Sequence, residues 1–199
     1  RTPGGSSGGS AVALATGMSA LELGSDIGAS IRNPAHYVGV FGHKPTYGLV
    51  PQDGILPPGC ETAGDIAVCG PLARSARDLD LGLSVLAGPA GYDQVGYRVE
   101  LPPAKQNRLS DFRVGVLLES PACETDLKLV NQLQNTIDHL AKAGLSVVDS
   151  APDFDQKEFF ENYLMLLRAA NGAAASDDVY VGAEQGARAW ERGDRSYRN

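Results

Sequence analysis

Two runs of glycine and serine near the start of the chain restrict how this region can fold. The first run is RTPGGSSGGS and the second is GSDIGASIR, and the apolar segment AVALATGM follows directly on the first run. Gly/Ser-rich segments are usually solvated spacers. A spacer does not normally pass straight into an apolar, helix-favouring segment. The pattern therefore favours a tight backbone cradle built around serine hydroxyls.

The composition is that of a globular protein with a substantial core. The chain has 199 residues, of which 43% are hydrophobic and 21% are charged, and its formal net charge is −7. This acidic balance without a basic cluster argues against a nucleic-acid partner. No apolar run approaches the length of a membrane span, so no membrane partner is expected. The length predicts one domain over residues 1–199, either alone or with an appendage.

Cysteines and histidines are few and scattered along the chain. No CxxC pair occurs, and the histidines lack the spacing of metal ligands. We therefore expect reduced thiols, a cytoplasmic location, no metal and no cofactor. The residues concerned are Cys60, Cys69, Cys123, His36, His43 and His139.

The region around the two runs is predicted to alternate short elements with loops. A helix is expected over 10–18 with Ser10 as its N-cap, and SALELG predicts a short strand that ends at Gly24. Residues 25–30 form the second Gly/Ser loop. The next segment, NPAHYVGVFGHKPTYGLVPQDGILPPG, is dense in Gly and Pro and is expected to be ordered loop with little helix.

The segment SARDLDLGLSVLAG predicts a capped helix. Ser75 opens it and Asp78 follows three residues later, as in a capping box. Its leucines keep helical spacing, and Gly88 ends the helix. Residues 89–110 are a polar connection that contains proline.

A second block of alternating elements follows. FRVGVLLE predicts a buried strand at 112–119, an amphipathic helix is expected over 125–143, and LSVVD predicts a short strand. Another helix is expected over 156–170. The tail, 171–199, is either loose or part of further structure. Strand–helix–strand order favours α/β layering with a partly parallel sheet.

The serines of the two runs are the candidates for chemistry. They are Ser6, Ser7, Ser25 and Ser30. One interpretation makes them turn formers, whose hydroxyls cap backbone groups. In the other, successive amides around Gly28 and Ala29 converge on one oxygen anion, as an oxyanion hole requires. Ser30 then stands at the end of the loop as a nucleophile that still needs a base.

The order of the motifs resembles the amidase signature family. GGSSGGS, then LGSDIGASIRNPA, then GVFGHKPTYG, and later GDIAVCGPLARSARDLDLGLSVLAG, are similar to the core of these enzymes. The likeness is dense over 1–90 and diffuse beyond. It implies a layered α/β/α fold with a mixed central sheet, of which this chain is an incomplete portion.

The resemblance also implies a Ser–Ser–Lys hydrolase. Ser30 aligns with the acylated nucleophile, and Ser6 aligns with the serine that follows a cis peptide bond and relays a proton. Ser7 and Asp26 align with residues that support the loop. The backbone amides that align with the oxyanion hole are those of Ile27, Gly28, Ala29 and Ser30.

Two departures from the family pattern affect the expected chemistry. Ala29 stands where the family usually has glycine, which narrows the backbone angles without removing an N–H donor. The family's base lysine lies upstream of its GGSSGG motif, so it is expected before Arg1. Lys44 aligns with a family lysine that is not the base. Residues 1–199 alone are therefore expected to have little or no amidase activity.

Arg32 has two interpretations. Its guanidinium could hold a substrate carboxylate in a bidentate fork, or it could brace the loop by pairing with Asp26 or Asp65, which we favour. Asp65, before CGPLARS, and Arg74, within it, are expected to hold loops together.

The leading functional hypothesis is an amidase that converts a small-molecule amide and water into a carboxylate and ammonia or an amine. A second is the amidase-like glutaminase component of a tRNA-dependent amidotransferase. A third is a non-catalytic relative that keeps the loops but lacks the base. The sequence does not indicate the natural amide or the oligomeric state.

Overall fold

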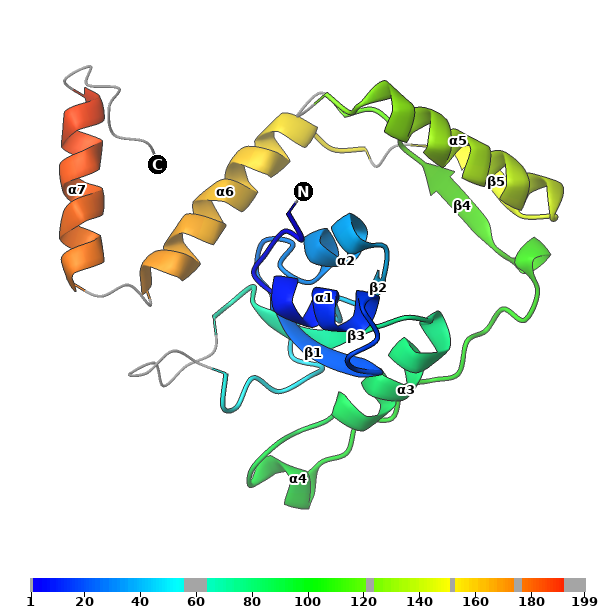
Figure 1. Cartoon of the computed structure of the whole chain (residues 1–199), viewed down its shortest axis with the longest axis horizontal. Helices are drawn as coiled ribbons and strands as arrows, with labels where there is room; N and C mark the ends of the chain where they lie inside the picture. Colours follow the sequence, from blue (N-terminus) through cyan, green and yellow to red (C-terminus); the bar gives the residue numbers. More distant parts are fainter. Residues whose placement is uncertain (1, 56–63, 121–123, 151–152, 174–176, 192–199) are drawn as a thin grey trace. The chain divides into compact units, whose positions relative to one another are not determined.

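The computed structural model describes residues 2–55, 64–120, 124–150, 153–173 and 177–191 (Figure 1). The chain divides into two compact units. Unit 1 comprises Arg1–Glu100 and Leu167–Asn199, and unit 2 comprises Leu101–Leu166. Both contain helices and strands, so the predicted α/β class is confirmed.

Unit 1 is built on a three-stranded antiparallel sheet. Its strands are β1 (Leu21–Asp26), β2 (Phe41–Gly42) and β3 (Val68–Ala73), in the order β1-β3-β2. Gly24 pairs with Gly70, and Asp26 pairs with Val68. Every residue of the central strand β3 is buried. The strand that was predicted to end at Gly24 is confirmed as β1, but it continues for two more residues, to Asp26.

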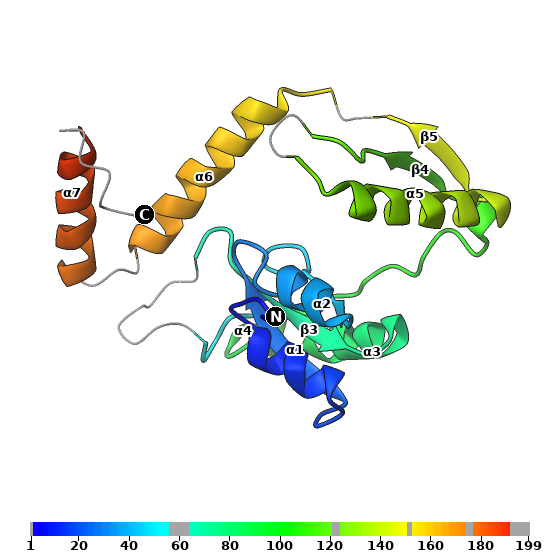
Figure 2. The same cartoon turned by 45° about the horizontal axis from the view of Figure 1, so that its top comes forward.

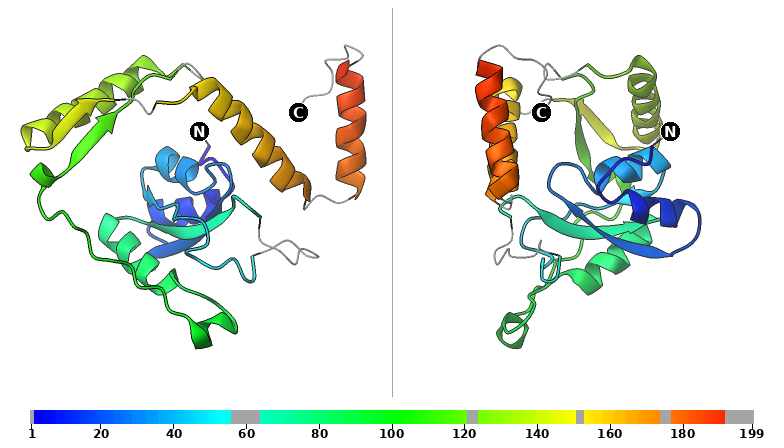
Figure 3. Two further views of the ribbon diagram at one scale, coloured as in Figure 1. Left: turned by 180° about the vertical axis from the view of Figure 1, so that it is seen from behind. Right: turned by 60° about the vertical axis from the view of Figure 1, so that its left-hand side comes forward.

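Helices lie on both faces of this sheet. They are α1 (Gly8–Ala15), α2 (Arg32–Val38) and α3 (Ala76–Leu86). Leu72 of β3 belongs to the buried core formed with α1 and α2, whereas a Cβ built on Gly82 of α3 would lie 3.0 Å from Pro71 Cβ. Because neighbouring strand residues point to opposite faces, α1 and α2 cover one face and α3 covers the other (Figure 3).

The core beside the sheet is small and apolar. It consists of Ala11, Leu14, Ile31, Ala35 and Leu72, with Val38 and Val40 packed against it. Leu14, Ile31 and Leu72 are completely buried. Burial of a leucine or isoleucine side chain stabilises a fold by about 1.5–3 kcal/mol, so these residues fix the two Gly/Ser loops that adjoin them.

Two helix predictions in this region need correction. α1 begins at Gly8, so Ser10 lies inside the helix, and Ser7 takes the N-cap position without a side-chain capping bond. α2 lies where ordered loop was expected. Pro34 is in its first turn, where the missing N–H has no intrahelical partner anyway, and Gly39 ends it with a φ of 78°.

The prediction for α3 is confirmed in detail. Ser75 is the N-cap, and its hydroxyl oxygen accepts the Asp78 N–H at 3.1 Å and donates to Asp78 Oδ2 at 2.8 Å. The helix ends at Leu86. The connection that follows contains a short helix, α4 (Asp93–Gly96), and one 3₁₀ turn at Leu109–Asp111.

Unit 2 is a strand–helix–strand unit (Figure 2). β4 (Arg113–Val116), α5 (Leu127–Lys142) and β5 (Ser146–Asp149) follow in order, and the two strands are parallel with Val114 paired to Val147. The predicted parallel pairing is confirmed. The predicted strand at 112–119 is too long, and its burial is wrong, because Arg113, Val114 and Gly115 are exposed.

Two further helices complete the described chain. The helix predicted over 156–170 is confirmed as α6 (Gln156–Ala173), which is longer by about one turn. α7 (Asp177–Glu191) lies in the tail, for which the sequence predicted either loose chain or further structure. No helix in the described residues combines the length and apolar character that crossing a membrane requires.

Candidate active site

The two Gly/Ser runs lie against each other in unit 1. The Ser7 N–H donates to the Ser30 carbonyl oxygen at 3.1 Å. The Ser7 hydroxyl also accepts the Ser25 N–H at 3.3 Å and lies 3.4 Å from the Ser25 carbonyl oxygen, to which it donates. Ser7 therefore joins the first run to β1 and to the loop that carries Ser30. The Gly5–Ser6 peptide bond is cis, as predicted.

This close approach requires a glycine that sequence reasoning did not single out. A Cβ on Gly24 would lie 2.6 Å from Ser7 Oγ and 2.8 Å from Leu72 Cδ1. Both distances are shorter than real Cβ contacts allow, so only glycine fits between the serine and the core. The Gly-Ser-Asp run itself is the sequence signal that could have indicated this position.

Asp26 is the centre of the second loop. It ends β1, and its side chain is 0% exposed. Oδ1 accepts the Ala29 N–H at 2.8 Å and Arg32 Nη2 at 2.9 Å. Oδ2 accepts Arg32 Nε at 3.0 Å and the backbone N–H groups of Ile31 and Arg32 at 3.1 and 3.3 Å. The carboxylate thus caps the start of α2 and closes the loop.

The surroundings of Asp26 favour its charged form. Burial by itself would raise the pKa of the carboxyl group. The Arg32 side chain and the N–H groups of Ile31, Ala29 and Arg32 outweigh this and lower the pKa from 3.8 to about 2. Arg32 pairs with Asp26, so the bracing contact is the one that the structure contains.

Ala29 has an unusual backbone conformation. Its φ is 80°, and among the described residues it is the one non-glycine with positive φ. Its N–H donates to Asp26, and its carbonyl oxygen accepts the Asn33 N–H at 2.7 Å. The resemblance aligns the Ala29 amide with the oxyanion hole, and in this structure that N–H is bound to the Asp26 carboxylate. Asn33 was not singled out from the sequence, and its residue type carries no signal because the contact is through its backbone.

The backbone N–H groups of the residues on either side of Ala29 differ from the Ala29 N–H in their hydrogen bonding. Within the part of the chain that the structure describes, the N–H groups of Gly28 and Ser30 donate to no protein acceptor. Gly28 is exposed and Ser30 is half-buried. These two N–H groups are therefore available to an oxygen atom of a ligand.

The two candidate catalytic serines flank this loop contact. Ser6 is exposed and directly precedes Ser7, whereas Ser30 directly precedes the N-cap of α2. In the described residues, no hydrogen bond joins the Ser6 and Ser30 hydroxyls. The contact between their loops runs instead through the Ser7 N–H and the Ser30 carbonyl.

The remaining polar candidates have structural contacts or lie at the surface. Lys44 Nζ donates to the Pro45 carbonyl oxygen at 3.3 Å. Arg74 donates to the carbonyl oxygens of Leu14 and Ser19, and so holds the end of α1 as predicted for a loop-holding residue. Asp65 is exposed.

Cys69 is the cysteine that the structure describes, and it is packed inside unit 1. Burial raises the pKa of its thiol, as expected of a packed cysteine. Cys60 and Cys123 lie outside the described residues. Among the described residues, no group of three or more His, Cys, Asp or Glu side chains could hold a metal ion.

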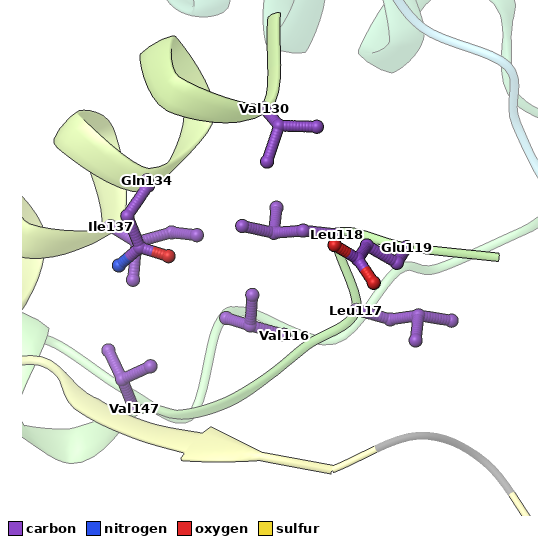
Figure 4. A pocket seen from close by; sticks show the side chains of 8 residues that line it. All are labelled: Val116, Leu117, Leu118, Glu119, Val130, Gln134, Ile137 and Val147. Carbon is purple, nitrogen blue, oxygen red and sulfur yellow. The ribbon is translucent and has the colours of Figure 1, made fainter. Parts of the chain in front are cut away.

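Unit 2 contains a separate hollow of about 490 Å³ between β4, α5 and β5 (Figure 4). Apolar side chains form most of its wall, with Glu119 and Gln134 as its polar members. The lining residues are Val116, Leu117, Leu118, Glu119, Val130, Gln134, Ile137 and Val147. None of the predicted site residues lines it.

Comparison with known protein families matches residues 1–196 to the amidase family. Among curated proteins, the chain is similar to a glutamyl-tRNA(Gln) amidotransferase subunit of Thermus thermophilus, with 41% identity over 187 residues, 92% of this chain and 38% of that protein. The corresponding protein of Saccharolobus solfataricus is 40% identical over 185 residues, 92% of this chain and 37% of that protein. The chain thus spans less than two fifths of the length of these relatives.

Solved structures give the same result. A fatty acid amide hydrolase superposes with a TM-score of 0.74 and 27% identity, over 84% of this chain and 30% of that one. The corresponding glutamyl-tRNA(Gln) amidotransferase subunit of Thermotoga maritima has a TM-score of 0.74 and 26% identity, over 95% of this chain and 42% of that one. With the family match over nearly its whole length and the Gly/Ser loops arranged as described, this chain belongs to the amidase family.

Proposed function

We propose that the protein is an amide hydrolase that acts through an acylated Ser30. The observation that carries the proposal is the hydrogen bond from the Ser7 N–H to the Ser30 carbonyl oxygen. It brings the loop of Ser6 beside the loop of Ser30, which is what a shared proton relay needs. The membership in the amidase family supports the same chemistry.

In the proposed mechanism, Ser30 Oγ attacks the carbonyl carbon of the amide. The N–H groups of Gly28 and Ser30, which have no protein acceptor in the described chain, donate to the oxyanion that forms. Ser6 passes the Ser30 proton on, and a proton returns to the leaving nitrogen as the C–N bond breaks. Water then attacks the acyl-Ser30 ester and releases the carboxylate. The sum is amide plus water to carboxylate plus ammonia or an amine.

The general base is the remaining part of this mechanism. The resemblance assigns it to a lysine upstream of the GGSSGG motif. Lys44 is the one lysine in the sequence of unit 1, and its Nζ donates to the Pro45 carbonyl oxygen. We therefore propose that Lys44 is not the base. A serine hydroxyl without its general base loses about 10²–10⁴-fold in rate, so residues 1–199 assayed alone should turn over amides slowly or not at all.

A second candidate function is the hydrolysis of glutamine as one component of an amidotransferase. The identity of 41% and 40% to proteins named as glutamyl-tRNA(Gln) amidotransferase subunits favours it. The two functions share the Ser30 chemistry and differ in the ammonia's fate. Glutamine hydrolysis that is slow alone and rises when a partner protein is added would favour the second function. Turnover of simple amides without a partner would favour the first.

The test of the proposal is Ser30→Ala in the protein at its natural length. We expect turnover to fall by about 10⁴-fold or more, and labelling by a serine-reactive fluorophosphonate to disappear. Folding should change little, because Ser30 is only half-buried and lies outside the apolar core.

Ser10→Ala is the matched control. Ser10 belongs to the first Gly/Ser run but lies inside α1, so labelling and turnover should persist. Wild-type rates in the Ser30→Ala protein would rule out Ser30 as the nucleophile. A wild-type protein that is neither labelled nor active would support the non-catalytic alternative.

A further inference from the structure

Ala29 adopts a backbone conformation that an alanine avoids on its own. An L-residue at a φ of 80° brings its Cβ close to backbone oxygen, and the left-handed region is populated chiefly by glycine. The conformation is held from both sides. The Ala29 N–H donates to Asp26 Oδ1 at 2.8 Å, and the Ala29 carbonyl oxygen accepts the Asn33 N–H at 2.7 Å.

The conformation of Ala29 determines where the next N–H points. The Ser30 N–H belongs to the same rigid peptide plane as the Ala29 carbonyl. Because that carbonyl is bound to Asn33 at the start of α2, the Ser30 N–H points the opposite way and meets no protein acceptor in the described chain. A return of Ala29 to negative φ would turn this plane relative to Gly28 and redirect the Ser30 N–H.

The Asp26 carboxylate is itself held in place. Arg32 binds both of its oxygens, through Nη2 to Oδ1 and through Nε to Oδ2. The completely buried carboxylate therefore presents Oδ1 to the Ala29 N–H in one orientation. The acceptor that stabilises the left-handed alanine is fixed in position.

We propose that Asp26 and Ala29 act as one coupled positioning pair, in which the Asp26 hydrogen bond offsets the left-handed alanine and so aims the Ser30 N–H at the oxyanion. The proposal rests on the proposed function of Ser30. It predicts that the orientation of the Ser30 N–H depends on Asp26 because residue 29 is alanine. A glycine at position 29 takes the same φ without penalty, and the need for Asp26 then becomes smaller.

A double-mutant cycle in the protein at its natural length tests this coupling. The four proteins are the wild type, Asp26→Asn, Ala29→Gly and the double variant. The measurements are the rate of fluorophosphonate labelling at Ser30, and kcat and KM for an amide substrate. We expect Asp26→Asn to lower the labelling rate and kcat on the order of tenfold, with KM changed little.

In the Ala29→Gly background, the same Asp26→Asn change should lower the labelling rate and kcat only about twofold. Glycine keeps the left-handed conformation without the carboxylate. The Ala29→Gly protein supplies the reference labelling rate for this background. An equal loss in both backgrounds would overturn the coupling, since it would show that Asp26 acts without Ala29.

Two further variants keep the proposal testable if Asp26→Asn does not fold. Ala29→Gly should raise the melting temperature by about 2–5 °C, because it removes the left-handed penalty. Ala29→Val should lower the labelling rate by about tenfold or more, because a β-branched residue tolerates positive φ worst. Unchanged labelling in Ala29→Val, or a lower melting temperature in Ala29→Gly, would overturn the proposal.

The matched control is Ala15→Gly. Ala15 is an exposed residue at the end of α1 with an ordinary helical conformation, so glycine should lower the melting temperature there and not change labelling. A wild-type protein that fluorophosphonate does not label would overturn the proposed function and this inference together. A labelled wild type with uncoupled variants would overturn this inference alone.

Discussion

The two units bury their side chains to very different extents. In unit 1, Leu14, Ile31 and Leu72 are completely buried, and every residue of β3 is buried. In unit 2, none of the residues 101–120, 124–148, 150 and 153–166 is buried. Val114 of β4 is 38% exposed, and Leu133 of α5 is 41% exposed.

The number of layers explains this difference. The sheet of unit 1 has helices on both faces and a central strand that is paired along both edges. The described residues of unit 2 form two strands and one packed helix, α5, and a two-stranded sheet buries little by itself. The proposed site therefore rests on the part of the chain with a local core, and its geometry should be more resistant to change than that of unit 2.

The largest expected effect comes from adding one methyl group to a strand glycine in each unit. A Cβ at Gly70 would overlap the His43 carbonyl oxygen and lie 2.6 Å from Pro45 Cδ. We expect Gly70→Ala to destabilise unit 1 by at least about 3 kcal/mol. At Gly115 of β4 the nearest atom is Ser150 O at 3.2 Å, so Gly115→Ala should cost less than about 1 kcal/mol.

Hydrogen exchange measured by mass spectrometry would separate the two units. Peptides from β3 should lose protection in Gly70→Ala, while peptides from β4 should change little in Gly115→Ala. Equal losses of protection in the two variants would contradict the contrast in packing.

The next effect is the pH dependence of unit 1. The folded pKa of Asp26 is lowered from 3.8 to about 2. The contribution of the charged carboxylate to the stability of unit 1 is therefore fully present above the pKa of the unfolded state. It is lost as the pH falls towards 2. A shift of this size corresponds to about 2 kcal/mol. Urea unfolding between pH 5 and pH 2.5, followed by NMR signals of Leu72 and Val147, would report on the two units separately.

Asp26→Asn is the control for this measurement. It removes the titrating group, so the unfolding of unit 1 should lose about 2 kcal/mol of its pH dependence in that variant. If Leu72 reports the same pH dependence in both proteins, the carboxylate is not the source of the effect.

The smallest expected effect compares one helix cap in each unit. Ser75 accepts the Asp78 N–H at 3.1 Å at the start of α3, and Asp126 accepts the Lys128 N–H at 2.7 Å at the start of α5. Loss of an N-cap side chain costs about 1 kcal/mol. Ser75→Ala and Asp126→Ala should therefore destabilise their helices by similar amounts.

Thermal melts with hydrogen exchange in α3 and α5 would check this pair. Because the cap bonds are local, the difference in core packing between the two units should not change the stability that is lost with each cap. A cap effect several times larger in α3 than in α5 would show that packing in unit 1 amplifies local contacts.

Local patterns in the sequence were enough to predict several elements. The capped helix at α3, the amphipathic helix at α5 and the parallel β4–β5 pair were found from residue spacing and turn residues. These signals work because capping and periodicity act over a few residues. They failed at α2, where the proline that suggested a loop lies in the first helical turn.

The order of the Gly/Ser motifs by itself determined the family and the residues proposed for the site. It could not assign each amide a partner. Only the tertiary structure decided that the Ala29 N–H binds Asp26, that the Ser7 N–H reaches the Ser30 carbonyl, and that Gly28 and Ser30 keep free N–H groups in the described chain. The physical reason is that hydrogen bonds between distant segments form only where packing has fixed both partners, and the core around Leu14, Ile31 and Leu72 does this.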